Sequence, residues 1–159
     1  MGERTIWRLD PCVPADWILL AQTLERLARF AQQDGHGIVH TMSEAMRQWT
    51  APQRGERPGA AAWVAVVDGT VVGHVVAEVA RESDTWFVNV AQYVADRGHA
   101  WTRAERERVL GDIRAWGASL GIEQVRCTTR SPALARAFAL LGFIDTGRRV
   151  LVLQRGAHG

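Results

Sequence analysis

Four polar residues stand at alternating positions in two apolar runs, and their types suit proton transfer. His74 and Glu78 lie four residues apart, so in an extended strand their side chains share one side, roughly 13 Å apart. Asn89 and Tyr93 are spaced in the same way in the next run. An imidazole or a carboxylate can act as a general base, and a tyrosine hydroxyl as a general acid. The same alternation is typical of the wetter face of a half-buried antiparallel sheet, and this is the interpretation that we favour.

The elements that would position these residues are strands and helices in mixed order. Asp68-Gly69 predicts a hairpin between the runs 63–67 and 71–80, and a third strand follows over 85–94. A long amphipathic helix is predicted over 102–120, with Gly121 as its stop. The other predicted elements are a strand over 5–9, helices over 14–33, 41–49 and 132–141, and strands over 123–128, 143–145 and 148–154.

The long helix must connect a strand before it to a strand after it, which makes that crossing parallel. The order therefore predicts an α/β (α+β) fold with a mixed, mostly antiparallel central sheet flanked by about four helices. A chain of 159 residues is the size of one domain, and we expect a single domain over 1–159.

Composition excludes several classes of protein. All 19 basic residues are arginine, which excludes a Schiff-base lysine, and the net charge of +2 is interleaved with acidic residues rather than clustered, which argues against nucleic-acid binding. No apolar run approaches 18 residues and the N-terminus has no apolar signal region, so we expect neither a membrane span nor secretion by a signal peptide. Cys12 and Cys127 have no disulfide or metal spacing, and His36 and His40 have no third ligand at a recognised spacing, so no metal site is predicted.

The element order, the hairpin AWVAVVDGTVVGHVVAEV and the segment SPALARAFALLGF resemble the GNAT superfamily of acyl-CoA N-acyltransferases, over about residues 5–154. In that family a helix ending in Leu-Gly-Phe precedes the last hairpin, and Leu141-Gly142-Phe143 match this ending. The resemblance implies the GNAT fold and a reaction in which acetyl-CoA acylates an amine. In such a reaction Glu78 or His74 would be the base, and Tyr93 a substitute acid.

The family binds the CoA diphosphate with a loop of the form Q/R-x-x-G-x-G/A at the start of the long helix. The matching stretch reads WTRAER and contains no glycine: Trp101, Thr102, Arg103, Ala104, Glu105 and Arg106. Thr102 and Glu105 instead have the spacing of a capping box, which would occupy two backbone donors that otherwise face a phosphate.

Two further positions depart from the family pattern. Phe138 stands where many members carry a tyrosine that protonates the leaving thiolate, and Ser131 stands where an asparagine often contacts the cofactor. The sequence thus predicts a GNAT-like domain that has lost its cofactor cradle, binds no cofactor and serves as a protein-binding module.

A narrower likeness points to the kind of partner. Trp86-Phe87-Val88, the helix from Thr102 and the segment 128–143 are similar to small GNAT-like proteins encoded beside internal virion proteins of short-tailed phages, over about residues 85–155. This likeness implies that the partners are virion components and that the protein is located in the virion or in the host cytoplasm. An oligomer is compatible with it. The interface candidates are large aromatic and arginine residues next to loops: Trp49, Trp101, Arg103 and Arg106.

Two alternatives stay open. One is an active N-acetyltransferase with an atypical cofactor loop, which would use acetyl-CoA. The other is a regulator that binds an acylated small molecule between splayed strands without reacting with it. The glycine content of the loop favours the binding module over the enzyme.

Overall fold

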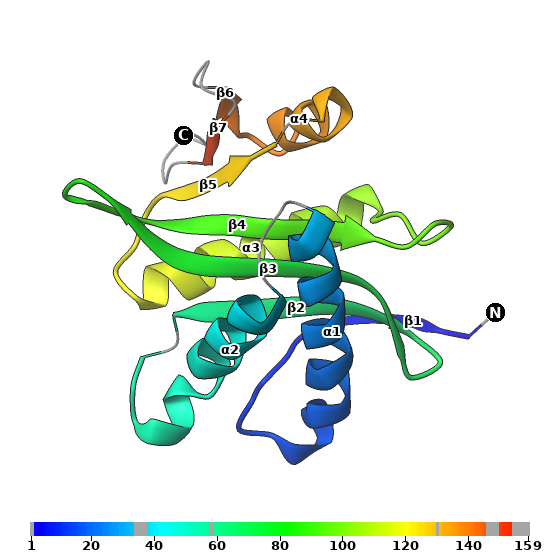
Figure 1. Cartoon of the computed structure of the whole chain (residues 1–159). Helices are drawn as coiled ribbons and strands as arrows, with labels where there is room; N and C mark the ends of the chain where they lie inside the picture. The colour runs from blue at the N-terminus through cyan, green and yellow to red at the C-terminus, as the bar shows by residue number, and fades with distance from the viewer. Residues whose placement is uncertain (1, 34–37, 58, 130, 146–149, 154–159) are drawn as a thin grey trace. The chain divides into compact units, whose positions relative to one another are not determined.

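The computed structural model describes residues 2–33, 38–57, 59–129, 131–145 and 150–153 of the chain (Figure 1). The strands are β1 (Arg4–Arg8), β2 (Ala60–Val67), β3 (Thr70–Glu82), β4 (Thr85–Ala95), β5 (Val125–Thr128), β6 (Ile144–Asp145) and β7 (Val150–Leu153). The helices are α1 (Trp17–Gln33), α2 (Ile38–Trp49), α3 (Arg103–Ser119) and α4 (Pro132–Ala139), with short 3-10 helices at Pro14–Asp16 and Ala51–Arg54. Hydrogen bonding orders the strands β1-β2-β3-β4-β5-β7-β6.

This mixed arrangement confirms the predicted fold class, and most predicted elements lie within a few residues of their observed bounds. Helix α2 begins at Ile38, three residues before the predicted start. Helix α4 ends at Ala139, because the backbone N–H of Phe143 turns back to donate to the carbonyl of Phe138 while Gly142 takes the left-handed conformation at a φ of 92°.

The chain divides into two compact units, and strands β3 and β4 contribute residues to both. The first unit comprises residues 1–76 and 92–100, and the second comprises residues 77–91 and 101–159. Each unit is described by itself below. No helix in the described part of the chain combines the length and the apolar character that crossing a bilayer requires.

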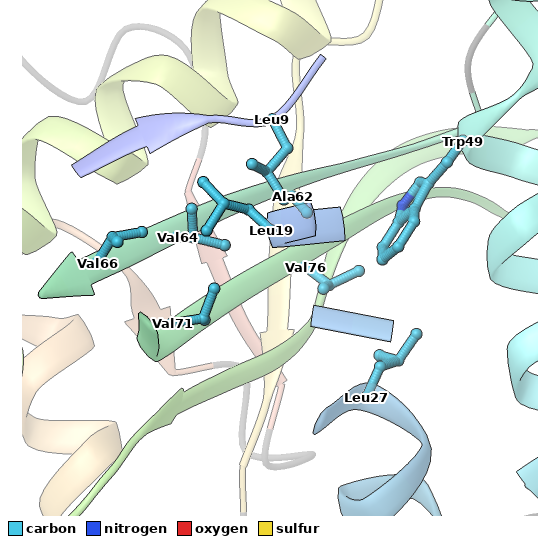
Figure 2. Packing of buried hydrophobic residues seen from close by; sticks show 9 residues of the cluster. All are labelled: Leu9, Leu19, Leu27, Trp49, Ala62, Val64, Val66, Val71 and Val76. Atoms are coloured by element: carbon cyan, nitrogen blue, oxygen red, sulfur yellow. The ribbon is translucent and has the colours of Figure 1, made fainter. Parts of the chain in front are cut away.

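The core of the first unit lies between its strands and the helices α1 and α2. Strand β1 pairs with β2 in antiparallel register, from Arg4 opposite Val67 to Arg8 opposite Trp63. The turn from β2 to β3 places Asp68 and Gly69 at positive φ, as a two-residue hairpin requires. Figure 2 shows the apolar cluster, whose residues come from β2, β3, α1, α2 and the position after β1: Leu9, Leu19, Leu27, Trp49, Ala62, Val64, Val66, Val71 and Val76.

In the second unit, α3 packs against the parallel pair of strands that it connects. Strand β4 pairs with β5 from Val88 opposite Val125 to Val90 opposite Cys127, which confirms the predicted parallel crossing. Gly117 allows a close approach, because a Cβ there would lie 3.0 Å from a methyl carbon of Val88. The buried face of α3 consists of Val109, Leu110, Ile113, Trp116 and Gly117.

Burial of one face of α3 makes its apolar residues sensitive to loss of a single methylene. Ile113 is fully buried, whereas Ile18 on α1 is 72% exposed. We expect Ile113→Val to lower the free energy of unfolding by about 1 kcal/mol, because the lost carbon leaves unfilled space. Ile18→Val, which makes the same chemical change in a helix, should change it by less than about 0.5 kcal/mol. Chemical denaturation of both variants measures the difference, and equal values would contradict the assigned burial.

Candidate functional site

The first turn of α3 in the second unit is closed by its own side chains. The Thr102 hydroxyl accepts a hydrogen bond from the backbone N–H of Glu105 at 3.2 Å, and the Glu105 carboxylate accepts one from the backbone N–H of Thr102 at 2.8 Å. Both bonds of the predicted capping box are therefore present. They use two of the four backbone donors that a helix leaves unsatisfied at its start.

The other two donors of this turn point to solvent. No partner is found in the described part of the chain for the backbone N–H groups of Arg103 and Ala104, and both residues are exposed. The guanidinium of Arg103 pairs with Glu107 at 2.9 Å, and Arg106 is half-buried in the same turn. This end of the helix dipole attracts anions, but the Glu105 carboxylate opposes them. The turn therefore leaves two backbone donors without a protein partner among the described residues.

The candidate base Glu78 is exposed on β3 and held by a neighbour on β4. The side-chain amide of Asn89 donates to Oε1 of Glu78 at 3.1 Å. No partner of Oε2 occurs among the described residues. The sequence predicted that Glu78 and Asn89 each lie on one side of their own strand, but it did not predict the hydrogen bond between them.

Two family positions of the second unit serve packing and capping. Phe138 is 1% exposed and meets the ring of Phe143 edge to face at a centroid distance of 5.0 Å. Ser131 caps α4, since its hydroxyl accepts from the backbone N–H of Leu134 at 3.2 Å. Phe138 has no proton to donate, and the hydroxyl of the exposed Ser131 accepts the capping bond.

In the first unit, His74 belongs to a buried chain of hydrogen bonds. Its Nε2 lies 2.8 Å from the Oε1 of Gln92, and its Nδ1 accepts from the Nε–H of Arg26 at 3.1 Å. Because Arg26 is a donor only, Nδ1 must be the unprotonated nitrogen, and Nε2–H donates to Gln92. Burial lowers the pKa of His74 to about 4. Both ring nitrogens are engaged and the residue is fully buried, so His74 is not available as the base for an external amine.

The guanidinium of Arg26 completes this cluster. It forms an ion pair with Asp96 at 2.8 Å and also donates to the backbone carbonyl of Val71 at 3.3 Å. Arg26 is only 7% exposed, although it is a charged residue. No local pattern signals this network, because its members come from positions 26, 74, 92 and 96.

The other candidate residues fall into different environments. Tyr93 lies on β4 in the first unit as a half-buried residue whose hydroxyl oxygen is buried. Cys127 is buried on β5, and burial raises its pKa to about 12, so it stays a thiol. The described residues contain no group of three metal-ligating side chains. His36 and the side chain of His40 lie outside the described residues.

The two aromatic interface candidates are not at the surface. Trp49 is 4% exposed and Trp101 is 5% exposed, so the expectation that they form an exposed interface is wrong. Their positions next to loops were misleading, because proximity to a loop does not determine whether a side chain is exposed. Trp17 and Trp86 are 54% and 53% exposed. Of the four candidates, Arg103 is exposed and Arg106 half-buried.

Comparison of the structure with solved structures identifies the fold. A predicted acetyltransferase from Clostridium acetobutylicum, solved with acetyl-CoA, matches with a TM-score of 0.66 and 10% identity over 92% of this chain and 93% of that one. A GNAT-family acetyltransferase from Streptococcus pneumoniae gives 0.59 and 13% identity over 97% and 100%. The aminoglycoside N-acetyltransferase AAC(6')-Iy in complex with CoA gives 0.59 and 16% identity over 93% and 92%.

No protein-family model matches the sequence, and no curated protein matches it as a relative. At these identities the likeness shows the fold alone. The chain therefore has the fold of GNAT acetyltransferases, as its element order predicted.

The neutral state of His74 makes stability depend on pH. The folded protein keeps this imidazole unprotonated down to a pKa of about 4, whereas the unfolded chain takes up a proton near the ordinary value of 6.5. The contribution is fully present above pH 6.5 and is lost as the pH falls toward 4. We expect this group to lower the free energy of unfolding by about 2 kcal/mol between pH 6.5 and pH 5.

Chemical denaturation at several pH values measures this loss, and His74→Gln should flatten its dependence on pH over the same range. Nuclear magnetic resonance titration of the imidazole gives an independent measurement on the unmodified protein. Protonation of His74 near pH 6.5 in the folded state would contradict the buried network.

Proposed function

We propose that the protein transfers an acetyl group from acetyl-CoA to an amine and that it holds the cofactor with an atypical first turn of α3. The observation that carries this proposal is the likeness of the fold, over 92% of the chain, to an acetyltransferase solved with acetyl-CoA. The wrong prediction of exposed interface tryptophans removes one argument for the binding module.

The residues of the second unit fit a phosphate group, although with reduced strength. The free N–H groups of Arg103 and Ala104 would donate to it, and the guanidinium of Arg106 supplies positive charge in the same turn. Acetyl-CoA, when bound, supplies an activated thioester. The Glu105 carboxylate in this turn repels a phosphate, so the proposal implies weaker binding than a glycine-rich loop would give.

Glu78 is the proposed base. Its Oε2 takes a proton from the acceptor ammonium group and leaves a neutral amine, while Asn89 holds Oε1 through its side-chain amide. Phe138 has no proton to give, and the hydroxyl oxygen of Tyr93 is buried in the first unit, so in this scheme the leaving thiolate takes its proton from solvent. His74 has no part in this scheme.

A second candidate function rests on the capping box and on Phe138. Both fit a domain that no longer holds CoA and that binds other proteins instead. In this case the partners would be virion components of a short-tailed phage, in the particle or in the host cytoplasm, as the narrower sequence likeness implies. Cofactor binding discriminates between the two functions.

Thermal unfolding with and without acetyl-CoA tests the first function. A ligand at 100 times its Kd stabilises the folded state by about 2.7 kcal/mol, which raises the Tm of a chain of this size by several degrees. We expect Glu105→Gln to tighten binding about 2- to 5-fold, because it removes a negative charge and keeps an oxygen that can accept from Thr102. The gain should shrink as salt is added.

Asp112→Asn removes a charge of the same sign from an exposed position further along α3 and serves as the control. It should leave acetyl-CoA binding within about 2-fold of the unmodified protein, because the helix-end effect fades after one turn. Absence of any shift with acetyl-CoA, in the unmodified protein and in Glu105→Gln alike, would contradict the acetyltransferase and favour the binding module.

Removal of the proposed base should abolish turnover and spare cofactor binding. We expect Glu78→Gln to lower the rate of CoA thiol release by about 100-fold or more. Aminoglycosides are the first amines to test, because an aminoglycoside acetyltransferase shares the fold. Asp84→Asn, in the exposed turn after β3, removes a carboxylate outside the proposed machinery and should keep the rate. Equal rates in Glu78→Gln and the unmodified protein would exclude Glu78 as the base.

A further inference from the structure

Two carboxylates and one guanidinium lie on one side of the strands β3, β4 and β5 in the second unit. Glu78 and Glu82 are four residues apart on β3, so their side chains share this side. Arg126 on β5 lies on the same side, because it forms an ion pair with Glu82. The remaining residues that alternate onto this side, from Glu78 to Asn89 and on β5, are uncharged: Ala80, Thr85, Phe87, Asn89 and Thr128. The proposed base Glu78 therefore has one acidic and one basic neighbour on its own surface.

The pairing of the strands places Arg126 level with Glu78. Asn89 lies opposite Arg126 in the parallel pair of β4 and β5, and its side-chain amide bonds to Glu78 across β3 and β4. The three residues thus form one row over three strands, with neighbouring strands about 4.8 Å apart. Glu82 lies four residues beyond this row, at the end of β3. Strand register alone would therefore bring Arg126 to Glu78 rather than to Glu82.

The guanidinium of Arg126 is nevertheless directed away from that row. Its Nη1 donates to Glu82, its Nε donates to Gln124 at 2.6 Å, and its central carbon lies 4.1 Å from the ring centroid of Phe87. This side chain already crosses β4 to reach β3, so it is long enough to reach Glu78 as well. It is 17% exposed, and Glu82 is the only charged group among its three contacts. The ion pair with Glu82 therefore keeps the one cation of this surface away from the proposed base.

We propose that Glu82 is a positioning residue for the acetyl transfer, because its pairing with Arg126 leaves Oε2 of Glu78 free to take the proton of the acceptor ammonium group. This inference rests on the proposed function, in which Glu78 is the base. Without the charge of Glu82, the nearest carboxylate on this surface for Arg126 is that of Glu78. A carboxylate oxygen that accepts from a guanidinium takes up a proton less readily. Glu82 is 61% exposed, and an ion pair as exposed as this adds little to stability.

Nuclear magnetic resonance titration of the Glu78 carboxyl carbon tests this placement without any turnover. We expect the signal to titrate at a lower pH in Glu82→Gln than in the unmodified protein. Loss of a negative charge alone has the same sign, so Arg126→Met and the double variant complete a double-mutant cycle. If Arg126 turns to Glu78 when Glu82 is neutral, Arg126→Met should raise the titration pH by about 1 more in Glu82→Gln than in the unmodified protein.

The rate of CoA thiol release measures the consequence for the reaction. Glu82→Gln should lower kcat about 3- to 10-fold without changing acetyl-CoA binding, and Arg126→Met in the same background should restore most of the lost rate. A merely structural role predicts that the second substitution lowers the rate further. Asp84→Asn is the matched control, because it takes the partner at 3.2 Å from Arg81, which lies on the opposite side of β3 from Glu78. It should change neither the titration nor the rate.

The inference is overturned if Arg126→Met has equal effects on the titration in the two backgrounds, or if it fails to restore the rate of Glu82→Gln. Absence of transfer in the unmodified protein contradicts the proposed function instead, and the titration cycle still decides whether Arg126 turns to Glu78. Should the double variant fail to fold, a crystal structure of Glu82→Gln replaces it. A guanidinium nitrogen within hydrogen-bond distance of Glu78 would support the inference, and a guanidinium that stays over Phe87 would overturn it.

Discussion

The buried guanidinium of Arg26 is the constraint around which the first unit is arranged. A charge taken out of water is strongly unfavourable unless it is paired and hydrogen-bonded. The Asp96 carboxylate, the Val71 carbonyl and the Nδ1 of His74 pair with the Nη1 and Nε groups of this guanidinium, and they tie α1 to β3 and to the residue after β4. Its Nη2 is buried without a hydrogen-bond partner among the described residues. Burial keeps His74 neutral. The same bonds fix which nitrogen carries its proton, because the side-chain oxygen of Gln92 accepts from Nε2–H while its amide donates to the carbonyl of Leu27.

This network separates two residues that look alike in the sequence. His74 and Glu78 alternate along one strand, and both are residue types that accept protons. Burial gives His74 a structural role, whereas Glu78 is exposed and keeps a carboxylate oxygen open to a reactant. The backbone donors at the first turn of α3 also differ in availability, because Thr102 and Glu105 occupy two of them and leave two others open. The proposed acetyl transfer therefore depends on Glu78 and on the donors that the capping box leaves exposed.

Much of the fold was predictable because its signals are local. Asp68-Gly69 requires a two-residue turn, Ser131-Pro132 starts a helix, and the spacing of Thr102 and Glu105 specifies a capping box. The buried network was not predictable, since it depends on residues far apart in the chain. The interface candidates Trp49 and Trp101 were misassigned because proximity to a loop does not determine the direction of a side chain, and both side chains are buried.

The self-capped start of α3 has a consequence for evolution as well as for affinity. A helix end that depends on a bound anion frays when the anion leaves, so selection for a stable fold also preserves the anion site. Here the side chains of Thr102 and Glu105 form the capping hydrogen bonds, so the first turn of the helix does not depend on a bound anion. Selection on the fold is thereby uncoupled from selection on cofactor affinity, and exchange of one acidic side chain is enough to shift the balance between them.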